Sequence, residues 1–249
     1  GSAGPKHCRA FKKTVNAAKK VSAGMFWASG LGPLVRAFSE PQYLVVAYHS
    51  VGTERTKPHL EIAPEVFLRH LEYLKERGYA FRRFSEAEAV GMEKSACIYF
   101  DDGFKSVFDR AYPILKSFGI PATLFITTDY LDQKKEPGLY MDWEEARMIR
   151  DVFEFGSHSV SHPKLNKIPL AEAKEEMARS KNIIETKFGG RISAFSYPYG
   201  RSSEELERAA HEMGYRVTTA DKRFHKARPD PDDSRAVFKI KTGIPSPWF

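Results

Sequence analysis

Apolar residues along the chain form two kinds of segment. Short, nearly continuous apolar runs are typical of strands buried on both faces, and the first clear one spans residues 43–48. Longer segments with apolar residues three or four positions apart are typical of helices. In residues 64–78 they stand at positions 67, 68, 71 and 74, with Pro64 at the start and Gly78 at the end. These two residues favour a helix that begins and stops there.

The same alternation continues along the chain. Further strands are predicted at 96–100, 122–127, 152–155, 194–197, 215–219 and 238–240. Further helices are predicted at 107–118, 143–150, 170–187 and 204–213, with Pro113 expected to kink the first of them. Strands that alternate with helices imply a parallel sheet with crossover helices. We therefore expect an α/β fold, a distorted, TIM-barrel-like (β/α) barrel of about seven parallel strands. An open doubly wound sheet is the alternative.

Length and composition suit one such domain. The chain has 249 residues, of which 42% are hydrophobic, and this content excludes a wholly disordered chain. Cys8 and Cys97 are too few to stabilise a fold of this size by disulfides, so we expect free thiols and no sign of an oxidising compartment. No linker rich in Pro, Gly and Ser divides the chain. We expect a leader over residues 1–40, one catalytic domain over 41–249, and a monomer.

The positive charge is concentrated in the leader. Of the 39 Lys and Arg residues, seven lie in residues 1–40, where Glu40 is the one acidic residue, and the remaining 32 basic residues face 31 acidic ones. The body is therefore nearly neutral, and nucleic-acid binding is not expected. Residues 21–35 are too short and too rich in Gly and Ser for a membrane span, and no clear signal-peptide cleavage site follows. The leader is either a helix packed on the domain or a segment at a membrane surface.

Four predicted strands are followed by residues that can take part in catalysis or bind a metal ion. His49 follows the first, Asp101 and Asp102 follow the strand at 96–100, His158 and His162 follow the strand at 152–155, and Tyr199 follows the strand at 194–197. In parallel α/β folds the active site is built at the C-terminal ends of the strands. We therefore expect these residues to converge.

The residue types indicate a metal site. Two adjacent carboxylates at the end of an apolar strand raise the pKa of one another unless a cation lies between them. Two histidines four positions apart can bind one ion. Ser159 stands where helical zinc proteases have Glu, which disfavours a protease of that kind. Two His and one carboxylate, with water in the open position, suit a catalytic zinc site. Taken alone, the Asp pair also fits a helix-capping turn, and the His pair also fits a structural role.

Other catalytic classes lack support in the sequence. There is no Gly-x-Ser-x-Gly elbow, phosphate-binding loop or dinucleotide fingerprint, and neither cysteine is placed as a nucleophile. Metal-assisted hydrolysis by an activated water remains.

Three segments, 99–103 (YFDDG), 157–162 (SHSVSH) and 196–200 (SYPYG), resemble the leading motifs of the polysaccharide deacetylases, the NodB-homology domain of carbohydrate esterase family 4. They stand in the family's order, and the resemblance covers residues 42–220. It implies a distorted (β/α) barrel that removes acetyl groups from amino-sugar polymers. Its divalent metal is expected to be Zn, with Co or Ni as alternatives. By position, Asp101 matches the catalytic base and Tyr199 the residue whose backbone N–H holds the oxyanion. The metal ligands match Asp102, His158 and His162.

Two departures from the family pattern affect the expected site. Ser196 stands where many members have an Arg that orients the base, and Arg201 is a nearby substitute candidate. The late Leu-x-His motif, which supplies the general acid, is absent. However, residues 48–51 (YHSV) resemble the early motif of the subgroup that deacetylates poly-N-acetylglucosamine-type exopolysaccharides. His49 is therefore a candidate acid, and a histidine hydrogen-bonded beneath the barrel mouth is the alternative.

Aromatic side chains near the predicted mouth are candidates for stacking on sugar rings. These are Trp143, Tyr197 and Tyr199, with Tyr48 beside them. The remaining histidines show no ligand pattern and are expected to be structural or surface residues: His7, His59, His70, His211 and His225.

The expected function is metal-dependent N-deacetylation of a poly-N-acetylglucosamine-like exopolysaccharide or cell-wall glycan. Two alternatives remain: a metal amidase acting on a lipid-linked sugar or another small amide, and a carbohydrate-binding relative without turnover. The expected location is the bacterial cell envelope or the periphery of the cytoplasmic membrane.

Overall fold

The computed structural model describes residues 43–52, 60–89, 94–133, 136–219 and 238–241. The predicted leader, Cys8, His7, His59 and His225 lie outside these ranges. Within them, no helix has both the length and the apolar character needed to cross a bilayer.

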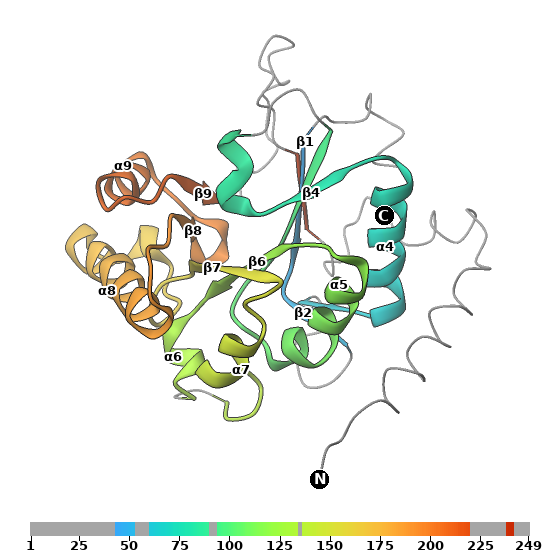
Figure 1. Cartoon of the computed structure of the whole chain (residues 1–249). Helices are drawn as coiled ribbons and strands as arrows, with labels where there is room; N and C mark the ends of the chain where they lie inside the picture. The colour runs from blue at the N-terminus through green and yellow to red at the C-terminus, as the bar shows by residue number, and fades with distance from the viewer. Residues whose placement is uncertain (1–42, 53–59, 90–93, 134–135, 220–237, 242–249) are drawn as a thin grey trace.

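Eight of the described strands form one curved parallel sheet (Figure 1). Its order is β10-β1-β5-β6-β7-β8-β9, and β4 pairs with the first half of β5. The strands are β1 (Tyr43–Tyr48), β4 (Ala80–Arg82), β5 (Ser95–Phe100), β6 (Ala122–Ile126), β7 (Phe153–Ser157), β8 (Ala194–Ser196), β9 (Val217–Thr219) and β10 (Phe238–Lys241). Two short strands, β2 (Ser50–Val51) and β3 (Glu61–Ile62), pair apart from it. The predicted α/β fold, a distorted (β/α) barrel of about seven parallel strands, is confirmed, and within the described ranges the barrel is open between β9 and β10.

The helices connect these strands and lie around the outside of the sheet (Figure 1). They are α4 (Pro64–Glu76), α5 (Tyr112–Phe118), α6 (Thr128–Leu131), α7 (Trp143–Met148), α8 (Leu170–Phe188) and α9 (Glu204–Glu212). The apolar positions that predicted α4 are buried: Phe67, Leu68, Leu71 and Leu74. Sequence reasoning missed β2, β3, β4 and α6, because segments of two to four residues are too short to show a period.

The predicted kink near Pro113 takes a specific form. Residues Val107–Ala111 are a π-helical turn, and α5 begins directly after it. Proline has no N–H to continue the ladder, and its ring crowds the carbonyl one turn earlier, so a widened turn relieves the clash. The helix ends at Gly119, which has a left-handed φ of 64°.

Both faces of the sheet are buried, which explains the continuous apolar runs. In β5, Ile98 and Phe100 belong to the large core shared with α4 and α5, whereas Cys97 and Tyr99 belong to a second cluster on the opposite face. In that second cluster, Phe84 and Phe125 contact Tyr99 edge to face, with ring centroids 5.8 and 5.2 Å away. The barrel interior is therefore filled with side chains, and a site can form only at an end of the strands.

Candidate functional site

The residues that follow the strands converge at one end of the sheet, as predicted. The parallel pairing of Tyr48 with Phe100 puts His49, after β1, beside Asp101, after β5. The Asp101 N–H donates to the Tyr48 carbonyl oxygen at 3.0 Å. After β7, the His158 N–H donates to the Ile126 carbonyl oxygen at 2.8 Å. These backbone contacts bring the segments after β1, β5, β6 and β7 to one place.

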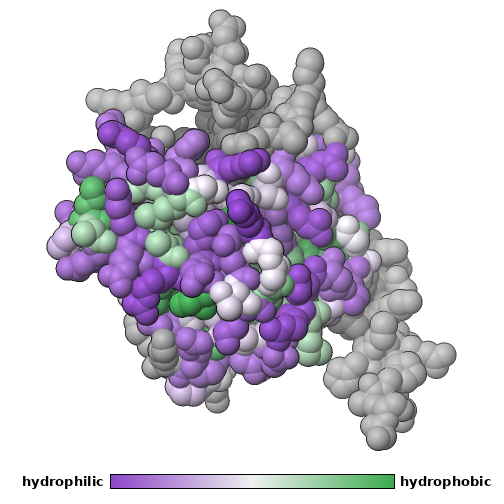
Figure 2. Space-filling model, turned by 60° about the vertical axis from the view of Figure 1, so that its left-hand side comes forward, coloured by the Kyte–Doolittle hydropathy of each residue, from purple (hydrophilic) through white to green (hydrophobic). Residues whose placement is uncertain are grey.

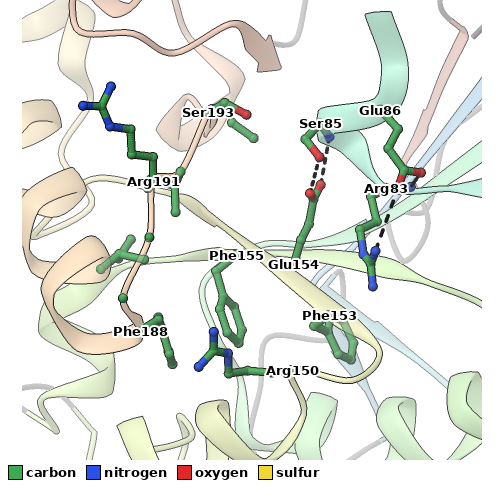
Figure 3. A pocket seen from close by; sticks show the side chains of 15 residues that line it. Arg83, Ser85, Glu86, Arg150, Phe153, Glu154, Phe155, Phe188, Arg191 and Ser193 are labelled. Carbon is green, nitrogen blue, oxygen red and sulfur yellow. Dashed lines mark hydrogen bonds and ion pairs between the residues drawn. The ribbon is translucent and has the colours of Figure 1, made fainter. Parts of the chain in front are cut away.

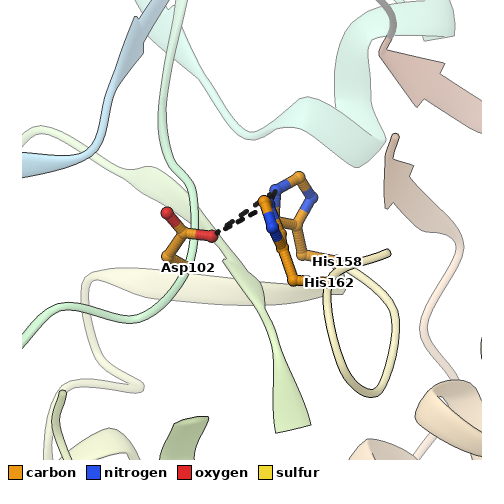
Figure 4. A group of neighbouring side chains, drawn as sticks. All are labelled: Asp102, His158 and His162. Carbon is orange, nitrogen blue, oxygen red and sulfur yellow. Dashed lines mark hydrogen bonds and ion pairs between the residues drawn. The ribbon is translucent and has the colours of Figure 1, made fainter. Parts of the chain in front are cut away.

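Asp102, His158 and His162 bring one ligand atom each to a common point (Figure 4). Asp102 Oδ1 lies 3.6 Å from Nε2 of His158 and 3.4 Å from Nε2 of His162. The two Nε2 atoms are 3.2 Å apart. Ligands held at zinc distances of 2.0–2.1 Å on a tetrahedron are separated by about 3.3 Å. The donor types and their spacing therefore fit a divalent metal ion.

A hydrogen bond fixes the tautomer of His158. Its Nδ1 lies 2.7 Å from the backbone carbonyl oxygen of Ser196. A carbonyl oxygen only accepts, so Nδ1 carries the proton and the lone pair of neutral His158 is on Nε2, which faces Asp102 and His162. Protein metal sites commonly orient their imidazoles in this way.

Four residues of the site have left-handed backbone conformations. The φ angles are 73° at Asp102, 69° at Ser159, 62° at His162 and 59° at Tyr199. Such a conformation is unfavourable for a non-glycine residue and persists only where its surroundings impose it. Here the His162 N–H donates to Ser159 Oγ at 3.1 Å, which closes the turn that carries His162 back toward His158.

Asp101 lies next to the three converging side chains. It is 6% exposed, and its Oδ1 is buried without a hydrogen-bond partner, 3.9 Å from Nδ1 of His158. A buried carboxylate oxygen without a donor is costly, so it indicates a role beyond stability. Arg201, the candidate substitute for the missing family Arg, is exposed, and within the described ranges the ion-pair partner found for Asp101 is His158.

An aromatic wall that sequence reasoning missed flanks the site. The Tyr130 ring lies 6.0 Å from the His162 ring and 4.2 Å from Tyr140, which in turn stacks on Phe104. Burial, and then the negative charge of Asp102, raise the pKa of both tyrosines, so they remain protonated. They lie in the long connection after β6, where no motif pointed to them.

The three predicted sugar-stacking residues have different environments. Tyr199 is 51% exposed, and its ring lies 4.6 Å from that of His162. Trp143 is 8% exposed, and its indole N–H donates to Asp132 Oδ1 at 2.7 Å. Tyr197 is 1% exposed, and its hydroxyl donates to the Leu206 carbonyl oxygen. Because Trp143 and Tyr197 are core residues without an exposed ring face, we do not assign them a stacking role.

Two further residues from the sequence analysis also lie in the core. Tyr48 is fully buried, with its hydroxyl 3.1 Å from Nδ1 of His70, so it has no ring face at the mouth. His70 is buried on α4, as expected for a structural histidine. His211 is exposed.

A pocket of about 410 Å³ lies at the other end of the sheet, beside the first residues of β7 and β8 (Figure 3). Phe153, Phe155 and Phe188 line it, with Arg83, Arg150 and Arg191 around them. The three arginine side chains point in different directions (Figure 3), so their charges do not converge on one ligand. The candidate catalytic and metal-binding residues lie at the opposite end, where the strands finish.

The exposed face in Figure 2 is mostly hydrophilic. Large hydrophobic side chains exposed within the described ranges are Met148, Leu170 and Tyr199. Of these, Tyr199 is the one that adjoins Asp102, His158 and His162 through its contact with the His162 ring. An exposed aromatic ring beside a polar site suits the binding of a sugar face.

Comparison with known proteins identifies the family. The model of the polysaccharide deacetylase family matches residues 89–218. The Bacillus subtilis protein YxkH, whose name assigns it to the polysaccharide deacetylases, is 28% identical over 91% of this chain and 83% of its own length. A poly-beta-1,6-N-acetyl-D-glucosamine N-deacetylase of Staphylococcus epidermidis is 24% identical over 70% of this chain and 65% of its own length.

Solved structures show the same fold. IcaB from Ammonifex degensii superposes with a TM-score of 0.65 at 22% identity, over 83% of this chain and 93% of that one. The family match covers more than half of this chain, and it includes the segments that carry Asp101, Asp102, His158, His162 and Tyr199. This chain therefore belongs to the polysaccharide deacetylase family.

Proposed function

We propose that this protein is a metal-dependent hydrolase that removes N-acetyl groups from a poly-N-acetylglucosamine-like exopolysaccharide. The observation that carries the proposal is the convergence of Asp102 Oδ1 with the Nε2 atoms of His158 and His162, beside the buried carboxylate of Asp101. The substrate class is supported by the Staphylococcus epidermidis relative, whose name gives that polymer. The YHSV segment at 48–51 supports the same subgroup.

Asp102, His158 and His162 are the proposed ligands of the metal, for which zinc fits the donor set. When bound, such an ion lowers the pKa of water toward about 7 and polarises a carbonyl group. Asp101 is the proposed base, because its unpartnered Oδ1 adjoins these ligands and can take the proton of the attacking water. The backbone N–H of Tyr199 is the proposed donor to the oxyanion of the tetrahedral intermediate.

His49 is the proposed general acid. The departing amine needs a proton, and His49 follows β1 directly, next to Asp101 in the parallel pairing. Its ring is half-buried. The Tyr199 ring is the proposed stacking surface for a sugar next to the one that reacts.

We also propose that residues 41–249 form the catalytic domain and that residues 1–40 are an appended basic leader, with the protein at the cell envelope or the membrane periphery. A polymer substrate made for export suits this location.

The test is acetyl release. Metal-free protein is prepared with a chelator, reloaded with zinc, and incubated with β-1,6-linked N-acetylglucosamine oligomers, and the products are followed by mass spectrometry. Loss of acetyl groups that depends on zinc supports the proposal. Bound zinc without acetyl loss from these oligomers contradicts the substrate and favours another amide. No bound zinc and no acetyl loss favours a binding protein without turnover.

A further inference from the structure

One carboxylate from α8 holds the loop between the two histidines. Glu176 Oε2 accepts from the backbone N–H groups of Val160 and Ser161, both at 2.9 Å. Glu176 Oε1 accepts from Ser161 Oγ at 2.8 Å. Within the described ranges, the contacts of this carboxylate are all with the two residues directly before His162.

The helix that carries Glu176 is a rigid support. Its buried side chains are Ala173, Met177, Ser180 and Ile184, which fix the helix against the sheet. Ser180 Oγ also lies 2.6 Å from Oγ of Ser157, the residue directly before His158. Therefore α8 holds the loop at two points, one before the first histidine and one before the second.

The loop needs such support because of its backbone. Ser159 and His162 both have positive φ angles, of 69° and 62°. Without outside contacts, a chain of non-glycine residues would leave these conformations, and the His162 ring would move away from His158. A carboxylate that accepts three hydrogen bonds from the loop selects the bent form, since hydrogen bonds to an ionised acceptor are the strong ones.

We propose that Glu176 is a positioning residue that sets the metal affinity of the site by holding His158 and His162 in convergence before the ion binds. This inference rests on the proposed function, because it takes the two histidines to be metal ligands. If the loop is held in advance, ion binding need not supply the free energy that orders it. If the loop is not held, the apparent zinc affinity is the intrinsic affinity multiplied by the fraction of time in which the two rings converge.

The experiment compares three variants of the full chain with the wild type. Glu176→Ala removes all three hydrogen bonds. Glu176→Gln is the conservative variant, because its amide oxygen can accept from both N–H groups and its amide nitrogen can donate to Ser161 Oγ. Glu175→Ala is the matched control, since Glu175 is the neighbouring residue on α8, is exposed, and pairs with Arg179 at 3.7 Å on the surface.

Zinc affinity is measured by competition with a chromophoric chelator, and the melting temperature is measured with and without zinc. We expect Glu176→Ala to weaken zinc binding about 10- to 100-fold, as changes behind metal ligands commonly do. Its zinc-induced rise in melting temperature should shrink accordingly. Glu175→Ala should match the wild type, and Glu176→Gln should lie within a few-fold of it. At saturating zinc, turnover of Glu176→Ala should return most of the way to that of the wild type.

Wild-type zinc affinity in Glu176→Ala overturns the inference, even if its metal-free form melts earlier, because that result describes a structural role only. If Glu176→Ala does not fold, Ser161→Ala replaces it; this variant removes one of the three hydrogen bonds, so a few-fold weaker zinc affinity is expected, and an unchanged affinity contradicts the inference. Failure of the proposed function is a different result: the wild type itself then binds no zinc, or binds it equally well after His162→Ala.

Discussion

His158 Nδ1 lies 2.7 Å from the backbone carbonyl oxygen of Ser196, and this contact joins the segment after β7 to the end of β8. Because the acceptor belongs to the main chain, the contact does not depend on which side chain stands at position 196. Position 196 is Ser in this chain, and its side chain takes no part in the contact that orients His158. The contact also turns the Nε2 lone pair toward Asp102 and His162. The first prediction tests whether Asp102 binds a metal ion there.

Asp102→Asn is expected to weaken zinc binding by about 100-fold or more, since a neutral amide oxygen is a poor substitute for a carboxylate ligand. Asn tolerates the φ of 73° at this position, so the fold should be kept. Metal content after dialysis, measured by mass spectrometry, checks this. Asp109→Asn, an exposed position in the same connection, serves as the control. Full zinc occupancy in Asp102→Asn would exclude Asp102 as a ligand.

Asp101→Asn should keep zinc and lose turnover. The amide has nearly the shape of the carboxylate but cannot take a proton, and loss of a general base lowers rates by about 10²- to 10⁴-fold. Parallel assays of zinc content and acetyl release check both parts. Turnover near the wild-type value would assign the base to another residue.

His49→Ala is expected to leave zinc content intact and to lower turnover by roughly 10²-fold or more, because the departing amine loses its proton donor. The pH profile provides a second readout: the wild-type limb on the alkaline side, where the acid loses its proton, should be absent in the variant. A retained limb with near-normal turnover would show that His49 is not the acid.

Tyr199→Asn tests the stacking surface separately from the backbone N–H of the same residue. Asn suits the φ of 59°, so the main chain should stay in place while the ring is lost. An aromatic contact of about 1 kcal/mol corresponds to a rise in KM for oligomers of about 5-fold, with kcat little changed. Trp143→Phe is the comparison: it breaks the bond to Asp132 and should lower stability without raising KM. An unchanged KM in Tyr199→Asn would contradict a stacking role.

His70 makes stability depend on pH. Burial, and then the charge of Arg69, lower its pKa from 6.5 to about 4. The unfolded chain therefore binds a proton at a higher pH than the folded protein does. Between pH 6.5 and about 4, the folded state loses stability as the pH falls, by up to about 3 kcal/mol in total.

His70→Gln keeps a polar partner for the Tyr48 hydroxyl and does not titrate. Urea unfolding of zinc-free protein at pH 7 and pH 5 should therefore show a smaller loss of stability on acidification in the variant than in the wild type. The difference between the two proteins in the free energy of unfolding lost from pH 7 to pH 5 isolates His70 from the other histidines. Equal losses would show that His70 is not buried in its neutral form.

Much of the fold is readable from local patterns. The continuous apolar run of β5 predicts burial on both faces, and the structure places Ile98 and Tyr99 in separate clusters on opposite sides of the sheet. The helical spacing at Phe67 and Leu71 predicts the buried face of α4. Local composition is sufficient here, because the period of apolar residues reflects how many faces of an element are covered.

The location of the site was readable for a similar reason. Parallel strands all finish at the same edge, so polar residues that follow β5 and β7 must be neighbours in space, however far apart they are in the chain. Asp102 and His158 could therefore be expected to meet. What remained open was whether their atoms face one another.

The tertiary structure decided the direction of each side chain. Trp143 and Tyr199 are both aromatic residues in segments that follow strands, yet one is buried against Phe188 and the other is exposed beside His162. Glu176 belongs to a helix with three other acidic residues, and nothing in its spacing distinguishes it from Glu175. The sequence by itself determined the longer strands and helices and the edge at which the chemistry lies. Backbone φ angles and helix docking, which arise only when distant segments pack together, decided which side chains face the site.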